Sequence, residues 1–271
     1  EQGKALTRWM ADVRQVVRTA EGKWKHPIKL VARVPARPEV ALGTGLDAVT
    51  WAKQGLIDHL VVAPFWATTD FDIPVEQWIE LLKGTGVGVT AGLEIRIQPY
   101  PGGPTIENTP ERRRGAAMAM LARGSQGIYL FNYFDVGSQM PFLLKEMHSV
   151  EALQRKDRSY LVTFVDISVP GKPIPAALPK RIEPGQSAEF RLFIGPKPLP
   201  GVRGELHLHY GPVVAPRLAA AYRPLDWLTI RASVLGRPIQ VPERTGSARG
   251  AAAIAATALT GESLAGVAVR L

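Results

Sequence analysis

Short apolar runs alternate with helical patterns along the first 150 residues, and this alternation limits the fold more than any other feature of the sequence. Strands that are separated by single helices join through right-handed crossovers into a parallel sheet. A closed (β/α) barrel needs eight strands and typically ~250 residues. Four strands therefore indicate about half of a barrel, or else a small open sheet. The predicted strands are residues 28–34, 58–63, 87–96 and 127–134, and the predicted helices are residues 6–20, 46–54, 74–82, 109–123 and 141–148.

The pattern changes after about residue 150. Short β-prone segments follow one another, separated by turns rich in proline and glycine, and strong helical periodicity is lacking. This is typical of an antiparallel β-sandwich. We therefore predict an α/β part in residues 1–150, a portion of a (β/α) barrel of about four βα units, and an all-β accessory domain, a β-sandwich, in residues 151–271. The predicted strands of the second part are residues 159–167, 187–194, 205–210, 227–234, 238–241 and 264–271.

Composition excludes several kinds of site. The chain has no cysteine, which rules out thiol nucleophiles, disulfides and thiolate metal sites but leaves the compartment open, a secreted location included. His207 and His209 alternate on one predicted strand without a third ligand nearby in the sequence, so we expect no metal and no cofactor. No run approaches the ~20 apolar residues that span a bilayer, so we expect no membrane span.

The net charge of +9 raises the question of a polyanionic partner. The basic residues are scattered, and the only tight cluster, Arg112 to Arg114, lies in the first turns of a predicted helix. We interpret this cluster as a solvated helix face, with a polyanion-binding surface as the alternative, and expect no nucleic-acid partner. An acidic polysaccharide suits the charge as well as a nucleic acid does, so the charge alone identifies no partner.

The predicted strand at residues 87–96 carries the first candidate for chemistry. Its larger apolar side chains fall on one face, and its glycines, Thr90, Glu94 and Arg96 fall on the other. Catalytic groups of a parallel barrel lie at the carboxyl ends of its strands, and hydrolysis of a glycosidic bond needs two carboxyl groups. Glu94 is therefore our candidate catalytic residue. The structural alternative is a salt bridge from Glu94 to Arg96, Arg33 or Arg123.

Aromatic and amide residues follow the ends of two other predicted strands. Trp66 comes after the second strand, and Asn132 and Tyr133 lie at the end of the fourth. A sugar ring has an apolar CH face and a rim of hydroxyls, so aromatic faces beside amide and carboxylate groups suit it. Packing of Trp66 and Tyr133 over the core is the alternative. The predicted substrate-binding residues are Trp66, Arg96, Asn132, Tyr133 and Asp135, and the candidates for a second carboxylate are Asp70, Asp72 and Asp135.

Several segments together resemble the C-terminal half of a family-10-like, clan A-type glycosyl hydrolase barrel. The segments are residues 28–35, Gly45-Leu-Asp-Ala-Val-Thr-Trp51, Gly55-Leu-Ile-Asp58, Gly92-Leu-Glu94 and Gly127-Ile-Tyr-Leu-Phe-Asn132. The resemblance covers about residues 5–140. It implies that Glu94 takes the place of the catalytic nucleophile on the seventh barrel strand, and that a β-sandwich follows, as in bacterial proteins of this kind. The family's acid/base glutamate follows the fourth strand, and no residue of this chain matches it.

Two functions from different classes follow from these features. The first is a glycoside hydrolase that acts on a polysaccharide or oligosaccharide, with Glu94 as nucleophile or base. The second is a non-catalytic carbohydrate-binding or scaffold protein, in which Glu94 only accepts hydrogen bonds. In either case a half-barrel leaves apolar strand edges and faces open. Either an N-terminal half that this chain lacks, or another subunit such as a second copy in a homo-oligomer, would have to close the barrel.

Overall fold

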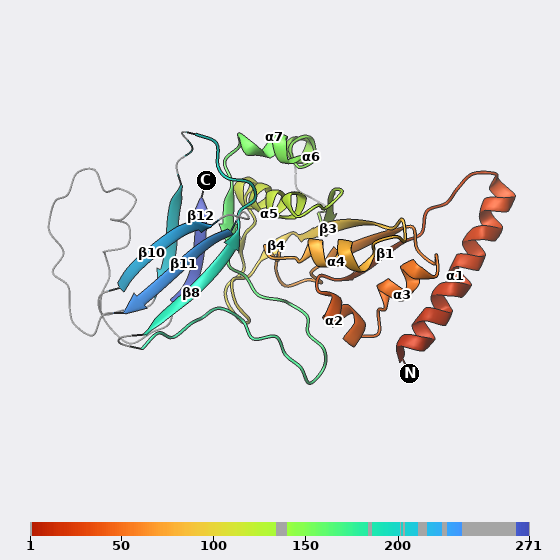
Figure 1. Ribbon diagram of the computed structural model, residues 1–271, viewed down its shortest axis with the longest axis horizontal. Coiled ribbons are helices and arrows are strands. Elements are labelled where there is room, and N and C mark those ends of the chain that lie inside the picture. Colours follow the sequence, from red (N-terminus) through yellow and green to blue (C-terminus); the bar gives the residue numbers. More distant parts are fainter. Residues whose placement is uncertain are drawn as a thin grey trace.

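The computed structural model describes residues 2–133, 140–183, 186–200, 202, 204–210, 216–223, 227–234 and 264–270. Its helices and strands fall into two groups along the long axis of the molecule (Figure 1). Helices and a parallel sheet make up the first group, and antiparallel strands make up most of the second. Within the described residues, no helix combines the length and the apolar character needed to cross a bilayer.

The first group is built on a four-stranded parallel sheet. Its strands are β1 (Val31–Pro35), β2 (His59–Ala63), β3 (Gly88–Glu94) and β6 (Ile128–Phe131). They lie in the order β1-β2-β3-β6, and every neighbouring pair is parallel. This confirms the four predicted strands and the parallel α/β arrangement. The predicted third strand is shortened, because the chain turns at Ile95 and Arg96 already belongs to a separate two-residue strand.

Helices connect and cover these strands. The five predicted helices are all present, and two further short ones, α2 and α7, were not predicted because each has too few turns to show a period. A small hairpin of β4 (Arg96–Ile97) and β5 (Ile106–Glu107) interrupts the loop before α5. The helices are α1 (Gln2–Trp24), α2 (Pro38–Gly43), α3 (Ala48–Lys53), α4 (Val75–Leu81), α5 (Pro110–Ala122), α6 (Met140–Glu146) and α7 (Val150–Gln154).

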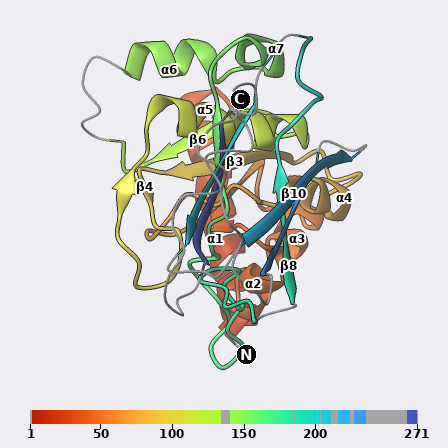
Figure 2. The same ribbon diagram turned by 90° about the vertical axis from the view of Figure 1, so that its left-hand side faces the viewer.

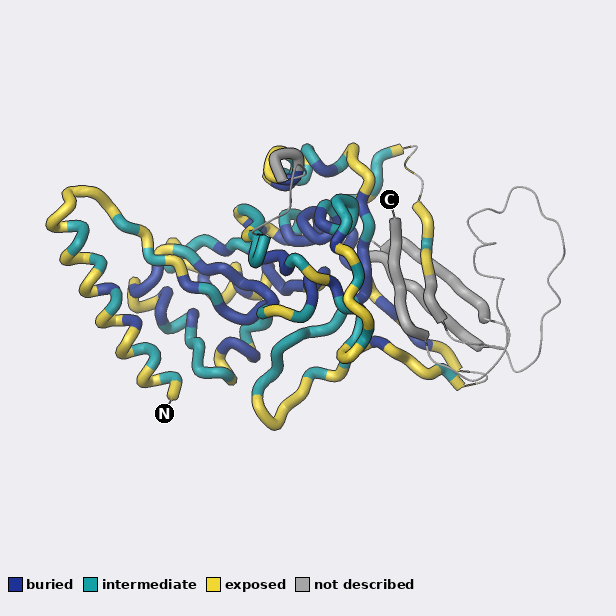
Figure 3. Tube along the Cα trace, turned by 180° about the vertical axis from the view of Figure 1, so that it is seen from behind, coloured by how far each residue is buried: buried dark blue, intermediate teal, exposed yellow. Residues whose placement is uncertain are grey.

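The core lies on one face of the parallel sheet. Val34, Val62, Ala91 and Leu93 are fully buried there, and Trp78 of α4 packs into the same cluster. Figure 3 shows these dark blue segments gathered around the sheet and α5, whereas α1 is mostly exposed or intermediate. This matches the predicted alternation, in which the larger apolar side chains of the third strand share a face. The opposite face carries the glycines of β3 and ends in Glu94.

The second group contains two three-stranded antiparallel sheets. Their orders are β10-β11-β8 and β7-β12-β9. Of the strands predicted here, the one at residues 238–241 lies outside the described residues, the first ends already at Leu161, and β10 was not predicted. Figure 2 views the molecule from this end. The strands are β7 (Ser159–Leu161), β8 (Ser187–Phe193), β9 (Glu205–Tyr210), β10 (Pro216–Arg223), β11 (Trp227–Val234) and β12 (Leu264–Arg270).

Helix α5 joins the two groups. Its residues from Gly115 to Met120 are buried without interruption, and the helix packs against β7. This half of α5 is apolar on all sides, so most of its sides must be covered. Our interpretation of the arginine cluster on this helix as a solvated face is wrong. Arg113 is 8% exposed, and Arg114 pairs with Glu146 of α6 at 2.6 Å, because the first turns of α5 are also covered.

The contact between α5 and β7 predicts an intolerant glycine. A Cβ placed on Gly115 would lie 2.0 Å from the main-chain oxygen of Ser159, so Gly115→Ala must push α5 and β7 apart. We expect the free energy of unfolding to fall by about 1–3 kcal/mol, as for other overpacked sites. The matched control is Gly22→Ala on α1, where nothing lies within 4 Å of the new methyl group. This control should raise stability by about 0.5–1 kcal/mol. Denaturant unfolding measures both, and equal effects would contradict the prediction.

Candidate functional site

The candidate site lies where the parallel strands end. Glu94 is the last residue of β3, and it is in register with Phe131 of β6. Arg33 of β1 shares a register row with Val61 and Thr90, so its side chain points to the same face as that of Glu94. Parallel strands bring their carboxyl ends to one edge of the sheet, which is where the loops of α/β proteins carry function. The structure therefore places Glu94 where the sequence analysis predicted it.

The Glu94 carboxyl group is buried and only half satisfied. The residue is 1% exposed. Oε1 accepts a hydrogen bond from the Ile95 N–H at 2.9 Å, and Oε2 is buried without a well-formed hydrogen bond from the residues that the structure describes. Burial raises the pKa of Glu94, since desolvation disfavours the charged form; the Ile95 N–H, the nearby Asn132 amide and the Arg33 charge offset part of this rise. Glu94 thus has one anchored oxygen and one buried oxygen without a well-formed hydrogen bond among the described residues.

The structural alternative for Glu94, a salt bridge, is wrong among the residues that the structure describes. Arg123 instead binds Asp72 and lies 3.8 Å from Glu76, and Arg96 is exposed on the β4 hairpin. Arg33 acts on Glu94 only as a nearby charge and forms no ion pair with it. A buried carboxylate without a paired cation is costly for a fold. Its presence at a strand end is therefore a reason to look for function.

Arg33 is a site residue that the sequence analysis considered only as an ion-pair partner. Its guanidinium carbon lies 3.7 Å from the ring centre of Phe131 and 4.9 Å from that of Phe65. One terminal nitrogen donates to the main-chain oxygen of Pro64, while Nε is buried without a partner. Arg33 is the one charged residue among residues 30–34, and this was the signal, because charge inside a strand is rare without a role. Arg33 and Glu94 each leave one buried polar atom unpaired, one a donor and one an acceptor.

Three side chains hold the main chain at the end of β3. The carbonyl oxygen of Glu94 accepts hydrogen bonds from Thr69 Oγ1 at 2.5 Å, Asn108 Nδ2 at 3.0 Å and Tyr133 Oη at 3.2 Å. Burial raises the pKa of Tyr133 to about 12, so its hydroxyl stays protonated and can donate. Thr69 and Asn108 were not predicted. The Tyr133 hydroxyl binds the main-chain oxygen of Glu94. The contact of Tyr133 with a sugar stays a prediction.

Asn132 follows β6 in an unusual backbone conformation. Its φ is 61°, in the left-handed region that non-glycine residues seldom adopt and that asparagine tolerates better than most. Such conformations concentrate at functional sites, where the surrounding structure holds them in place. In this conformation the Asn132 amide lies near the Glu94 carboxyl group and lowers its pKa. The structure thus brings together two of the predicted site residues.

Trp66 lies on the loop that leaves β2. Its indole is 66% exposed, and the Phe65 ring meets it edge-on, with ring centres 6.0 Å apart. The main-chain N–H groups of this loop donate to Asp166, a residue that the sequence analysis did not consider. The alternative considered for Trp66, packing over the core, is wrong, because the residue is exposed to solvent. An exposed, backbone-anchored indole is suited to stacking on the apolar face of a ligand.

The structure does not bring the other predicted site residues that it describes to the Glu94 side chain. Arg96 is exposed and pairs in the β4–β5 hairpin with Glu107, and Asp135 lies outside the described residues. Asp70 pairs with Arg37 at 3.1 Å, and Asp72 pairs with Arg123. Burial raises the pKa of Asp72, and Arg123 offsets part of this rise.

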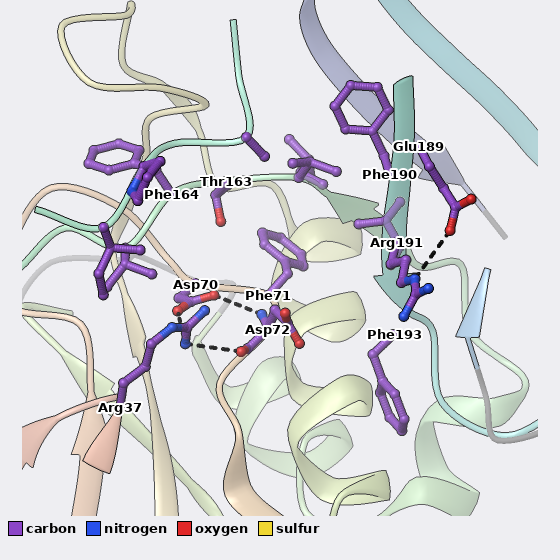
Figure 4. A pocket seen from close by; sticks show the side chains of 17 residues that line it. Arg37, Asp70, Phe71, Asp72, Thr163, Phe164, Glu189, Phe190, Arg191 and Phe193 are labelled. Carbon is purple, nitrogen blue, oxygen red and sulfur yellow. Dashed lines mark hydrogen bonds and ion pairs between the residues drawn. The ribbon is translucent and has the colours of Figure 1, made fainter. Parts of the chain in front are cut away.

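Asp70 and Asp72 line a cavity of about 240 Å³ between the sheet loops and β8 (Figure 4). Phe71, Thr163 and Phe190 line the same cavity, whereas Glu94 does not. Its charged groups are paired: Figure 4 shows Arg37 with Asp70 and Arg191 with Glu189, and Asp72 pairs with Arg123 outside the cavity lining. We therefore place the candidate site at Glu94 and not in this cavity. In the described part of the chain, no three histidine, aspartate or glutamate side chains gather in a way that could hold a metal ion.

Comparison with known proteins adds no assignment. No protein-family model matches the chain, and no curated protein matches it at a significant level. The resemblance to family-10-like glycosyl hydrolases therefore stays a proposal, and the function has to be argued from the geometry around Glu94.

The environment of Glu94 predicts a pH-dependent gain in stability when the carboxyl group is neutralised. Its folded-state pKa is raised, so the protein loses stability relative to a neutral side chain as pH rises above about 4.3, the unfolded value. Glu94→Gln should therefore match the wild type near pH 4 and exceed it at pH 8 by about 1 kcal/mol, a typical cost of an unsatisfied buried group. Guanidinium unfolding at both pH values measures this.

The control for this comparison is Glu80→Gln, because the Glu80 side chain is 74% exposed in its pair with Lys83. It should change the free energy of unfolding by less than about 0.5 kcal/mol at either pH. A Glu94→Gln effect of the same size at pH 4 and pH 8 would show that ionisation of Glu94 is not its cause.

Proposed function

We propose that this chain is part of a glycoside hydrolase, similar to the family-10-like enzymes, and that Glu94 is its nucleophile or base. One observation carries this proposal: Glu94 ends a parallel strand with one buried oxygen anchored and the other unpaired. A stable fold would pair or expose such a group. A carboxyl group that must attack an anomeric carbon or take a proton from water needs one free oxygen.

The surroundings of Glu94 suit this chemistry. The Ile95 N–H holds Oε1, which leaves Oε2 to form a bond to the sugar or to accept a proton. Burial shifts the pKa of Glu94 upward, toward neutral pH. A residue that both takes and releases a proton works best when its pKa lies near the working pH. The Arg33 charge and the Asn132 amide stabilise the ionised form that a nucleophile or base requires.

The proposed ligand is a polysaccharide or oligosaccharide. The exposed indole of Trp66 offers a flat apolar surface for the CH face of a sugar ring. The unpaired Nε of Arg33 and the Asn132 amide are donors for hydroxyl groups beside Glu94. Arg96, Tyr133 and Asp135 are proposed as further contacts of the sugar. The net charge of +9 favours an acidic polysaccharide over a neutral one.

For the fold, we propose that residues 1–150 form a portion of a (β/α) barrel and residues 151–271 a β-sandwich. The two three-stranded antiparallel sheets of this part of the chain support the sandwich. The barrel is supported by four consecutive parallel strands with β1 and β6 at the ends of the strand order. Closure would require four further strands. These strands would come from a preceding segment or from another subunit, for example a second copy of this chain.

A non-catalytic carbohydrate-binding protein is the second candidate. Glycosidases use two carboxyl groups. Of the rim aspartates that the structure describes, Asp70 and Asp72 are bound to arginines, and Asp166 accepts hydrogen bonds from main-chain N–H groups. None of these three offers a free carboxylate as the partner of Glu94. This favours binding without hydrolysis, and the two functions are separable by experiment.

The decisive measurement compares binding and hydrolysis on the same substrates. We expect the protein to bind and cleave a member of a panel of neutral and acidic polysaccharides, with release of new reducing ends. Glu94→Gln should lower the hydrolytic rate by about 10²–10⁴-fold while binding is retained, since the amide keeps the shape but cannot act as nucleophile or base. Glu80→Gln should keep the full rate.

Two results would contradict the hydrolase. A Glu94→Gln protein that keeps the wild-type rate would remove Glu94 from the chemistry. Binding by the wild type without any reducing ends would support the carbohydrate-binding protein instead. Binding that depends on the charge of the polysaccharide should weaken as salt is added, because ions screen exposed charges.

A further inference from the structure

The loop after β2 has three consecutive main-chain donors that converge on one atom. Residues 65, 66 and 67 direct their N–H groups to a single carboxylate oxygen at 2.8, 2.9 and 3.1 Å. Successive N–H groups of a loop cannot satisfy one another, and those that point the same way form a concave site for an anion. In this conformation the loop presents three donors to one negative charge.

The negative charge that the N–H groups of residues 65–67 bind comes from the second part of the chain. The oxygen belongs to Asp166, about 100 residues from the loop in sequence, on the segment that follows β7. Hydrogen bonds from N–H groups to an ionised carboxylate are shorter and stronger than those between neutral groups. A single side chain of the C-terminal part thus fixes a loop at the edge of the parallel sheet.

A second contact holds the other end of the same loop. Thr163 Oγ1 donates to the main-chain oxygen of Thr69 at 3.0 Å. Thr69 in turn donates to the main-chain oxygen of Glu94. The segment from Thr163 to Asp166 therefore fixes the loop at both ends, and the loop connects that segment to the strand that carries Glu94.

The fixed loop presents two aromatic rings with different environments. Phe65 is half-buried and lies 4.9 Å from the guanidinium carbon of Arg33, so it packs toward the sheet. Trp66 points outward with 66% of its surface exposed. A large exposed ring is unusual on a backbone held this firmly, since exposed aromatic residues on loops are often mobile. This combination fits a preorganised surface for a ligand.

We propose that Asp166 is a positioning residue of the carbohydrate site: it binds the N–H groups of residues 65–67 and so fixes Trp66 for stacking against a sugar ring. The identity of the ligand rests on the proposed function, whereas the positioning of the loop does not. Asp166 acts through the loop without touching the sugar. The C-terminal part of the chain is accordingly a component of the site and not only an appendage.

The first test follows the loop itself and needs no ligand. Asp166→Ala should speed amide hydrogen exchange at residues 65–67 by at least about tenfold, because the three N–H groups lose their acceptor. Asp166→Asn keeps an acceptor oxygen without the charge and should give an intermediate rate. Asp12→Ala, an exposed carboxylate on α1, should leave exchange in the loop unchanged. Unchanged exchange in both Asp166 variants, with the rest of the fold intact, would overturn the proposal.

The second test asks whether Asp166 acts through Trp66. Binding of the acidic polysaccharides of the same panel is measured for the wild type, Asp166→Asn, Trp66→Ala and the double variant. We expect Asp166→Asn to weaken binding by about tenfold when Trp66 is present and by less than about twofold when it is absent, the signature of coupled residues. Equal weakening in both backgrounds would indicate general destabilisation and would overturn the positioning role.

The two tests separate this inference from the proposed function. If the wild type binds no polysaccharide of the panel, the carbohydrate function fails, while hydrogen exchange at residues 65–67 still decides whether Asp166 holds the loop. If the wild type binds polysaccharides and exchange in the loop is insensitive to Asp166, the carbohydrate function stands and the positioning role fails. Asp166→Asn serves both tests if Asp166→Ala does not fold.

Discussion

The rim of the parallel sheet depends on the hydrogen bonds that converge on the main-chain oxygen of Glu94. Thr69, Asn108 and Tyr133 all donate to this one atom, and they come from the loop after β2, the segment before α5 and the end of β6. Three separate segments are thus fixed relative to the end of β3. Because the main chain of Glu94 performs this structural task, its carboxyl group does not have to. The same residue can hold the fold together and still keep one oxygen free.

That free oxygen has a cost in stability. Glu94 Oε2 and Arg33 Nε are both buried without partners, although each is capable of a strong hydrogen bond. They lie on the same face of the sheet, yet the stacking of Arg33 on Phe131 and its bond to Pro64 keep it from pairing with Glu94. Buried polar atoms without partners are uncommon in native structures, so each one is a reason to look for a functional role.

Periodicity predicted the strands and the position of Glu94 because both are local properties. Alternation along residues 87–96 is sufficient to place a carboxylate on the small-residue face near the strand end, and β3 confirms it. Thr69, Asn108 and Asp166 could not be predicted, because each matters only through contacts with residues far away in sequence. The arginine cluster at residues 112–114 was misread for a related reason. The start of α5 is polar in sequence, but Arg114 pairs with Glu146 of α6, and Arg112 donates to the main-chain oxygen of Glu107.

The second part of the chain reaches the candidate site through contacts that no local pattern contains. Gly115 brings α5 against β7, and the chain that leaves β7 then passes the rim, where Thr163 and Asp166 bind the loop of Trp66. Asp166 also acts on Glu94 at a distance, because its charge adds to the rise in the pKa of that carboxyl group. One aspartate thereby influences both the shape and the electrostatics of the rim. A catalytic or binding role for Glu94 would consequently require both parts of the chain, even though the hydrogen bond that anchors its carboxyl group comes from the first.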